Sequence, residues 1–509
     1  MRTIFKHCRT FHHQPGQFRS HMKNTVLATS LPLYRQLAGH IAEAIETGML
    51  RPGDRLPSVR HLSTQHRVSL STALQTYRYL ENCALVEARP KSGYFVRDNG
   101  AQPAAAEDAA GNGSNNHNER NEFNSGNTIF EVMQLAGANA GCMVRLDIAT
   151  GPAQVYPTRK LQQLIAGISR RQPEILTNYP TGTGYAELKS QIARRALDTG
   201  CHISPDDIII TSGSTESLHL ALRAVTQPGD TVAVESPTYF GILQIIDSLG
   251  LRALEIPTSP ATGISVSALD FATSTPAAVQ AVVLMPNFQN PLGSLMPDEN
   301  KERVVQLLAA RHIPLIEDDV YGDLYFGERR PLTAKSFDRQ HNVMLCNSAT
   351  KTLAPGLRIG WIVPGRWLRQ IEKLKYTSAM VTPELAQAAI AEFMRNGNYD
   401  HHMRKFRSGV KLQTGLMLAA VRRYFPPGTG ISNPQGGYLL WIELPQQISA
   451  RKVFELARAQ SIGIAPGSMF SHSTRFEHHI RLNCGYPWSP ALEDSVRTLG
   501  AIVAAQLEA

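Results

Sequence analysis

The first regular pattern along the chain begins near residue 33, where apolar side chains recur in an otherwise polar segment. Leu37, Ile41 and Ile45 are four residues apart, which places them on one stripe of a helix. Gly48 stands where this helix would end, because glycine readily adopts the conformations that terminate helices. The spacing therefore predicts an amphipathic helix over residues 33–48.

Two further helices and a hairpin are predicted before residue 97. Ser58 and Ser69 are each placed to cap a helix, because a serine hydroxyl accepts a hydrogen bond from an unpaired N–H of the first turn. Two short β-rich runs, at 85–88 and 94–96, flank a turn at 89–93. Three helices followed by a hairpin predict a winged helix-turn-helix domain over residues 31–97.

Residues 98–143 are expected to form a flexible linker. The first part of this segment is rich in Ala, Gly, Asn, Ser and acidic residues and almost lacks large apolar side chains. Such a composition does not bury enough apolar surface to offset the entropy of ordering. Residues 1–30, which are basic and have no acidic residue, are likewise expected to be a disordered tail that binds DNA loosely, and Met22 is an alternative start.

Beyond residue 144 the pattern changes to apolar runs typical of strands, which alternate with helical stretches. The runs lie at residues 208–211, 231–235, 280–285, 314–318 and 343–347. Strands that alternate with helices usually form a parallel sheet. Residues 144–509 are therefore expected to form an α/β domain with a mostly parallel sheet.

Charge separates the two predicted domains. The chain has 51 Lys or Arg against 42 Asp or Glu, a formal net charge of +9. Residues 1–97 hold 14 of the basic residues and 5 of the acidic ones, which leaves 37 of each sign in the remainder. The whole excess therefore lies in the predicted winged helix and its tail, which indicates a nucleic-acid partner for that part alone.

Composition excludes several other classes of protein. Apolar residues make up 42% of the chain, so it is not disordered as a whole, and no apolar run approaches the ~18 residues of a membrane helix. No secretory signal is evident. The six cysteines lack paired short spacings, which argues against a disulfide framework or a metal site. We expect a cytoplasmic protein without a membrane partner, associated with the nucleoid when bound to DNA.

Candidate chemistry gathers at the ends of the predicted strands. Asp318 ends the run 314–318, and Lys351 follows the run 343–347 within a Ser-Ala-Thr-Lys sequence. The sequence Ser-Gly-Ser-Thr at 212–215 opens a helix, where backbone N–H groups can bind a phosphate. Taken singly, each motif has an ordinary explanation, such as a surface lysine or a helix cap.

Taken together and in this order, the motifs closely resemble those of fold-type-I aminotransferases, which use pyridoxal phosphate (PLP). The resemblance covers about residues 144–509 and implies a second, smaller α+β subdomain. It implies that Lys351 forms the Schiff base with PLP and that Asp318 pairs with the pyridine nitrogen. The further roles that it implies are ring contacts by Tyr239, Asn290 and Tyr321, phosphate contacts by Gly213, Ser214, Thr215, Ser348 and Arg358, and a contact between Arg481 and the substrate carboxylate.

The basic N-terminal part has its own resemblance. Residues 50–60 read Leu-Arg-Pro-Gly-Asp-Arg-Leu-Pro-Ser-Val-Arg and resemble the GntR-type winged helix, whose fusion to an aminotransferase-like domain is the hallmark of the MocR subfamily. The expected DNA contacts are Ser58, Arg60, Arg67, Ser71, Thr72 and Lys91. Leu70 stands where the family usually has an arginine, so Ser69 and Leu70 are not among the expected DNA contacts.

The combined resemblance favours a PLP-binding, DNA-binding transcriptional regulator that senses an amino acid or amine. Proteins of this fold complete their PLP sites across a dimer, so we expect a homodimer that binds double-stranded DNA. One alternative is an autonomous aminotransferase with a DNA-tethering head, and residual transaminase activity is compatible with the intact Lys351, Asp318 and Arg481. Another is a repressor whose aminotransferase-like domain serves only for dimerisation.

Overall fold

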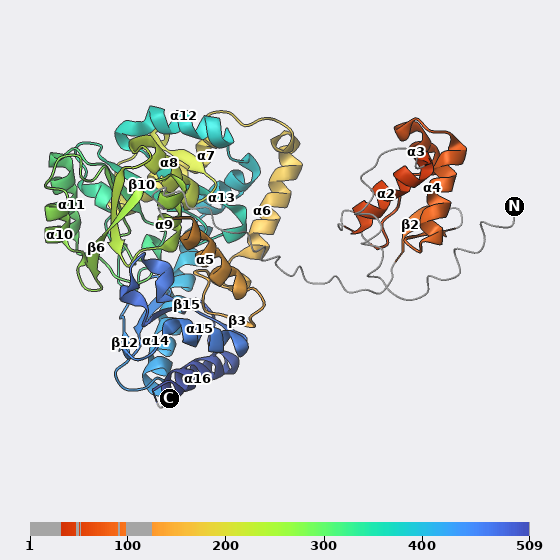
Figure 1. Ribbon diagram of the computed structural model, residues 1–509. Helices are drawn as coiled ribbons and strands as arrows, with labels where there is room; N and C mark the ends of the chain where they lie inside the picture. Colours follow the sequence, from red (N-terminus) through yellow and green to blue (C-terminus); the bar gives the residue numbers. More distant parts are fainter. Residues whose placement is uncertain (1–31, 47–49, 51, 90–91, 98–124, 508–509) are drawn as a thin grey trace. The chain divides into compact units, whose positions relative to one another are not determined.

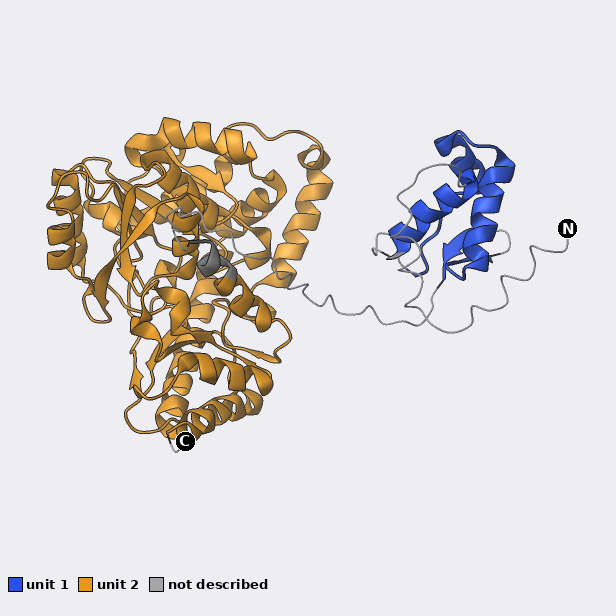
Figure 2. Ribbon diagram, in the orientation of Figure 1, with its two compact units in different colours: residues 1–120 blue, residues 121–509 orange. Residues whose placement is uncertain are grey.

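The computed structural model of the chain describes residues 32–46, 50, 52–89, 92–97 and 125–507. The chain divides into two compact units, residues 1–120 and 121–509 (Figure 2). The predicted tail at 1–30, the first part of the predicted linker and Lys91 lie outside the described residues.

The first unit is a winged helix-turn-helix, as the sequence predicts. Its elements are α2 (Leu33–Glu46), α3 (Val59–His66), α4 (Leu70–Asn82), β1 (Val86–Arg89) and β2 (Gly93–Val96), and the two strands pair antiparallel. Both predicted caps are present: the Ser58 hydroxyl accepts from the N–H of His61 at 3.2 Å, and that of Ser69 accepts from Thr72 at 3.1 Å. The caps fix where α3 and α4 begin.

The second unit is built on an eight-stranded sheet with the order β4-β11-β10-β9-β8-β5-β6-β7. The strands are β4 (Ile209–Thr211), β5 (Thr231–Ser236), β6 (Arg252–Ser259), β7 (Gly263–Ile264), β8 (Ala281–Leu284), β9 (Leu315–Asp318), β10 (Val343–Ser348) and β11 (Gly360–Val363). The neighbours from β10 through β6 are parallel, whereas β4, β11 and β7 pair antiparallel. The predicted mostly parallel sheet is confirmed, although β6, β7 and β11 are not among the predicted runs.

Helices cover both faces of this sheet (Figure 1). Alternate residues of β5 show this, because Val232 and Val234 pack in one apolar cluster and Ala233 packs in another. The first cluster includes α8 (Ser214–Val225), α9 (Phe240–Ser248) and α12 (Leu368–Ala379), and the second includes α10 (Val266–Ala272) and α11 (Asp298–Ala310). A strand buried on both faces has an unbroken apolar sequence, which is why these runs were recognisable.

Further helices complete the large layer and lead to a smaller subdomain. They are α6 (Thr158–Arg171), α7 (Ala186–Ala196), α13 (Glu384–Arg395) and the long α14 (Asn398–Tyr424). The subdomain holds the antiparallel sheet β12-β13-β16-β15, comprising Gly430–Ile431, Leu439–Glu443, His479–Asn483 and Ala465–Pro466. It also holds α15 (Ala450–Ala459), α16 (Pro490–Ala505) and the short pair β3 (Val144–Arg145) with β14 (Ile462–Gly463). This arrangement is the smaller α+β subdomain that the resemblance implied.

The prediction of a linker over the whole of 98–143 is wrong for its last part. Helix α5 (Ser125–Ala138) occupies it, and Val132 and Leu135 are buried in the apolar core of the small subdomain. The sequence did not predict this helix because the residues before it are polar and because only a few apolar side chains, such as Val132 and Leu135, anchor it. Within the described residues, no helix is long and apolar enough to cross a membrane.

Candidate functional site

The candidate site lies where the parallel strands of the large sheet end. Asp318 is the last residue of β9, and Lys351 follows the end of β10 by three residues. The side chains of Tyr239, Lys351 and Arg358 line one cavity of about 330 Å³ together with Arg481 of β16 in the small subdomain. In open α/β sheets, ligands bind at this carboxyl edge. The fold therefore unites four of the predicted residues around one space.

Lys351 lines this cavity and is fixed by a hydrogen bond. Its Nζ donates to the carbonyl oxygen of Ala149 at 2.9 Å and lies 5.8 Å from the ring centre of Tyr321. Burial lowers the pKa of Lys351 to about 8, and the positive charge of Arg481 acts in the same direction. An amine with a pKa near neutrality has a sizeable uncharged fraction, which is the form that attacks carbonyl carbons.

Three buried polar atoms around Lys351 have no hydrogen-bond partner within the described residues. They are Asp318 Oδ1, the Tyr321 hydroxyl and Arg481 Nε, and each of these three residues is only 1% exposed. Burial, followed by the neighbouring charge of Asp319, raises the pKa of Asp318 to about 7. Because buried polar groups are normally paired, these atoms mark positions that a polar ligand is able to satisfy.

The start of α8 and Arg358 form a second part of the site. Gly213 has φ +95°, and a Cβ there would lie 2.6 Å from a terminal nitrogen of Arg358, so only glycine fits without displacing the guanidinium. The same nitrogen donates to the Ser212 carbonyl at 3.3 Å. Ser214 and Thr215 occupy the first turn of α8, where Gly213 at the N-cap position offers no side chain to bond the first N–H groups. Such N–H groups beside an arginine suit an anion such as a phosphate.

Ser348 and Tyr239 complete the predicted set in the large layer. The Ser348 hydroxyl accepts from the Thr350 N–H at 2.9 Å and lies 2.5 Å from the Thr350 hydroxyl. Tyr239 immediately precedes α9, and its ring centre lies 4.8 Å from that of Phe240. Ser348 is thus already engaged locally, whereas Tyr239 presents its half-buried ring to the cavity.

Arg481 is fixed from several sides. It donates to Asn290 Oδ1 at 3.0 Å and to the carbonyl of Asp147, and its guanidinium lies 5.0 Å from the ring centre of Phe470. This places Asn290 beside Arg481, and the expected contact between Asn290 and the cofactor ring stays a prediction. An arginine held with its fork of donors at a cavity suits a carboxylate.

Residues 147–150, which the sequence patterns did not indicate, also line the cavity. Their carbonyl groups accept from Arg481, from Lys351, from the Tyr438 hydroxyl at 3.0 Å and from Asn483 Nδ2 at 2.6 and 2.7 Å. These contacts use backbone atoms, which any residue supplies, so no side-chain pattern marks the segment. The segment nevertheless contacts both Lys351 and Arg481 and so links the two side chains.

The predicted DNA contacts that the structure describes lie on or near the surface of the first unit. Arg60, Arg67 and Ser71 are exposed, and Thr72 is half-buried. The Ser58 hydroxyl caps α3, so it is already engaged in the helix. Leu70, the first residue of α4, is 53% exposed, which leaves an apolar side chain where an arginine was expected.

Comparisons with known proteins match both units. Residues 154–487 match the aminotransferase class I and II family, and residues 33–96 match the gntR family of bacterial regulatory proteins. The HTH-type transcriptional regulators YjiR and YdcR of Escherichia coli K12, both named as uncharacterized, are 37% and 36% identical to this chain. Each alignment covers 93% of this chain and 99% of the relative.

A solved structure matches the second unit alone. The α-aminoadipate aminotransferase LysN of Thermus thermophilus, complexed with N-(5'-phosphopyridoxyl)-L-leucine, superposes with a TM-score of 0.69 at 27% identity. The match covers 75% of this chain and 95% of that one. With both units assigned over nearly the full length, the chain belongs to the MocR subfamily of GntR-type regulators, which join a winged helix to an aminotransferase-like domain.

Proposed function

We propose that this protein is a PLP-binding transcriptional regulator, active as a homodimer, whose aminotransferase-like unit senses an amino acid or amine and alters DNA binding. The observation that carries the proposal is one cavity that joins Lys351 to Arg481, in a chain that also carries a winged helix. An aminotransferase does not need a DNA-binding domain for turnover, so the winged helix favours a regulator. A domain that served only for dimerisation would not need a cavity that joins a buried lysine to a buried arginine, so the cavity favours a sensor.

The unsatisfied atoms around Lys351 support PLP as the cofactor. The unpartnered Asp318 Oδ1 and Tyr321 hydroxyl would hold the pyridine nitrogen and the ring oxygen, and Tyr239, which lines the cavity, would stack on the ring. Residues at the start of α8 and near Arg358 would hold the phosphate, namely Gly213, Ser214, Thr215, Ser348 and Arg358. When bound, PLP supplies an electrophilic carbon that reacts with amines and a ring that withdraws electrons. Lys351 is the amine that this chain itself offers to it.

Asp318 gives the PLP-free protein a pH dependence. Its raised pKa means that the folded state holds more protons than the unfolded state between about pH 4 and pH 7. The unfolded chain loses the Asp318 proton near pH 4, whereas the folded protein keeps it until about pH 7, so the free energy of unfolding falls as the pH rises through this window. We expect Asp318→Asn, measured by urea unfolding at pH 5 and pH 8, to lose less stability than the parent over this range. An equal loss in both proteins would contradict the assignment.

Arg481 is proposed to hold the carboxylate of the sensed amino acid. We expect Arg481→Ala to weaken the spectral response to amino acids by at least about tenfold, because a charge-assisted pair is lost. The response to an amine that lacks a carboxylate is expected to persist, as is the PLP band itself. Loss of PLP binding in this variant would show that Arg481 belongs to the cofactor site instead.

The winged helix is proposed to bind double-stranded DNA through Ser58, Arg60, Arg67, Ser71, Thr72 and Lys91, of which all but Lys91 lie within the described residues. We expect Arg60→Ala to weaken binding by a similar factor for all sequences and to lower the salt slope by about 0.9, the value for one phosphate contact. Arg395→Ala removes the same charge from an exposed site of the other unit and serves as the control. An unchanged slope in Arg60→Ala would argue against a phosphate contact there.

The proposal as a whole is tested by measuring transamination and DNA selection with the same purified protein. We expect a visible PLP band, sequence-selective DNA binding, and turnover far below that of aminotransferases. Turnover at rates typical of enzymes, about 1 to 10³ per second, without selective DNA binding would favour an autonomous aminotransferase. Selective DNA binding without a PLP band would favour a domain that serves only for dimerisation.

A further inference from the structure

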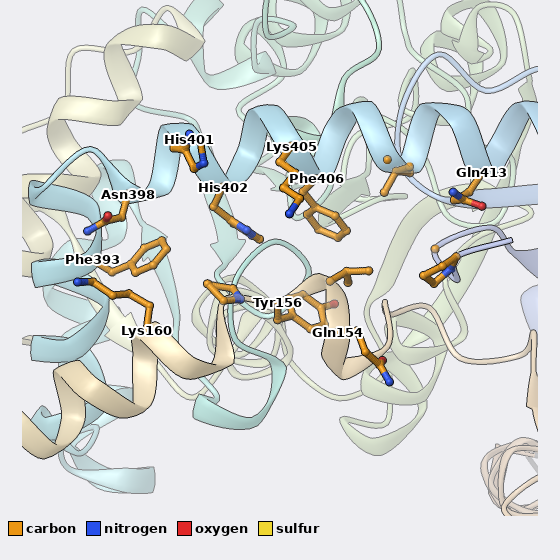
Figure 3. A pocket seen from close by; sticks show the side chains of 16 residues that line it. Gln154, Tyr156, Lys160, Phe393, Asn398, His401, His402, Lys405, Phe406 and Gln413 are labelled. Atoms are coloured by element: carbon orange, nitrogen blue, oxygen red, sulfur yellow. The ribbon is translucent and has the colours of Figure 1, made fainter.

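A second pocket, separate from the Lys351 cavity, lies between α14 and the start of α6 (Figure 3). It has a volume of about 430 Å³, within the range of small-molecule sites. We term it the α14 pocket and define it by Tyr156, Lys160, Phe393, His402, Lys405 and Phe406. The two cavities share none of their lining residues.

The lining of the α14 pocket has one sign of charge. None of its sixteen residues is acidic, whereas Lys160, Lys405, His401 and His402 are basic or titratable. Neither lysine takes part in an ion pair within the part of the chain that the structure describes. The carboxylates next to the lining in sequence are engaged elsewhere: Glu392 pairs with Arg171, and Asp400 pairs with Arg195. Uncompensated positive charge at a pocket favours an anionic ligand.

The remaining lining is apolar and aromatic. Phe393 and Phe406 are buried, and the ring of His402 stacks on that of Phe406 with centres 5.5 Å apart. In Figure 3, the side chains from α14 face Tyr156 and Lys160 across the pocket. The ring of Phe406 also packs edge-on against that of Tyr156, with centres 5.8 Å apart, so the rings form one apolar wall. A flat apolar body is able to lie against this wall while its anionic group meets the exposed Lys160 and Lys405.

Two walls of the pocket are bonded to segments that contact or adjoin Lys351. His402 Nε2 lies 2.7 Å from the carbonyl oxygen of Thr352, and since that oxygen only accepts, Nε2 carries the proton. The Tyr156 hydroxyl lies 2.9 Å from that of Thr150 and accepts from the Gly151 N–H at 3.0 Å. Thr150 adjoins Ala149, whose carbonyl accepts from Lys351. A ligand that moves His402 or Tyr156 therefore alters the surroundings of Lys351.

We propose that the α14 pocket is a second ligand site, which binds a small aromatic carboxylate and whose occupancy is transmitted to Lys351 through His402 and Tyr156. Binding itself depends only on the pocket, whereas the effect on a Lys351-bound cofactor rests on the proposed function. A ligand of this class needs no amino group, so it is chemically distinct from the amine sensed in the Lys351 cavity.

Two glycines of α14 allow one substitution that fills the pocket and one that serves as a matched control. Gly409 lines the pocket, and a Cβ at this position meets nothing within 4 Å, so Gly409→Leu places a side chain in open space without strain. Gly415 lies on the same helix, also meets nothing within 4 Å and is not part of the α14 pocket. Both changes remove a helical glycine, which on its own stabilises the helix.

The test is calorimetric titration of the PLP-loaded full chain with phenylacetate, which has no amine, and with neutral phenylacetamide. We expect phenylacetate to bind and phenylacetamide to bind at least about tenfold more weakly, since the amide lacks the charge. Gly409→Leu and the double variant Lys160→Gln/Lys405→Gln are expected to lose phenylacetate binding by about tenfold or more. Gly415→Leu and Arg404→Gln, an exposed charge outside the lining, are expected to bind as the parent does.

Transmission to Lys351 is read from the visible spectrum. Saturating phenylacetate is expected to change the PLP band of the parent but not that of Gly409→Leu. His402→Phe keeps a ring against Phe406 but lacks the bond to Thr352, so it is expected to bind phenylacetate and show a smaller spectral change.

Three results would overturn the proposal. The first is the absence of phenylacetate binding, and the second is binding that survives the pocket variants but is lost in Arg481→Ala, which would place the ligand in the Lys351 cavity. The third is an unchanged spectrum at saturation, which would refute transmission. Should the protein have no PLP band at all, the proposed function would fail, while calorimetry would still report on the pocket.

Discussion

Replacing Lys351 by alanine is expected to abolish the absorption band of lysine-bound PLP. Its Nζ is fixed by the Ala149 carbonyl at 2.9 Å, and its pKa is lowered to about 8, so it is placed and prepared to react with an aldehyde. Absorbance spectra of the purified variant after addition of PLP check this result. Borohydride reduction of the parent, followed by peptide mapping, should place the label on Lys351.

Lys373→Ala is the matched control for this variant. Lys373 lies on α12, is exposed and does not line the Lys351 cavity, so its loss is expected to leave the band unchanged. Persistence of the band in Lys351→Ala would refute the cofactor assignment, because no other lysine among the described residues lines that cavity.

The second large effect is expected at Arg330, in a buried ion network just behind the candidate site. Its guanidinium contacts Asp319, the residue after Asp318, and its Nε lies 2.5 Å from Asp323 Oδ1. Asp323 also accepts from the Tyr399 hydroxyl at 2.6 Å. Burial is the largest single influence and raises the pKa of Asp323, but the charges of Arg330 and Arg195, together with hydrogen bonds from Tyr399 and Arg330, outweigh it and lower this pKa to about 2.

Arg330→Met is expected to destabilise the protein by about 3–5 kcal/mol at neutral pH, because it leaves two carboxylates without their cation. Arg369→Met, at a side chain that is 92% exposed and paired with Glu372, is expected to cost at most about 0.5 kcal/mol. Urea unfolding followed by circular dichroism measures both.

The destabilisation caused by Arg330→Met is expected to depend on pH. A carboxyl group whose pKa is lowered on folding contributes stability above its unfolded pKa of about 4, and this contribution is lost as the pH falls toward 2. The cost of Arg330→Met should therefore shrink as the pH falls below about 4, because the stabilising contribution of the Asp323 carboxylate is lost there in the parent protein as well. A cost as small as that of Arg369→Met at neutral pH would refute the stabilising role of the network.

Sequence patterns identified most elements that depend on one strong local signal. The caps at Ser58 and Ser69 and the apolar strands β5, β8, β9 and β10 lie within one or two residues of their expected positions. These strands are buried on both faces, so each contains consecutive apolar residues, and charged side chains occur only at the carboxyl ends. The motifs at their ends then fall at the carboxyl edge, as the parallel topology requires.

Features held by distant or backbone contacts were not predictable. Helix α5 is anchored by Val132 and Leu135 against residues far along the chain, and β6 has an irregular mixture of exposed and buried positions. Residues 147–150 act through carbonyl groups, and Arg330 acts through partners that only the fold brings near. Asn290 is a residue that motif resemblance located, but its contact to Arg481 emerges only in three dimensions.

The central claim is that an amino compound bound near Lys351 changes how the protein binds DNA. Two sites coupled in this way must affect each other equally, since coupling free energies are reciprocal. The most direct test titrates the PLP-loaded protein with a panel of amino acids and amines, following the PLP band with and without operator DNA. The account predicts that DNA shifts the midpoint of an active compound by at least about fivefold, and that the compound shifts DNA affinity by the same factor. Identical midpoints with and without DNA, for every compound that changes the band, would contradict it.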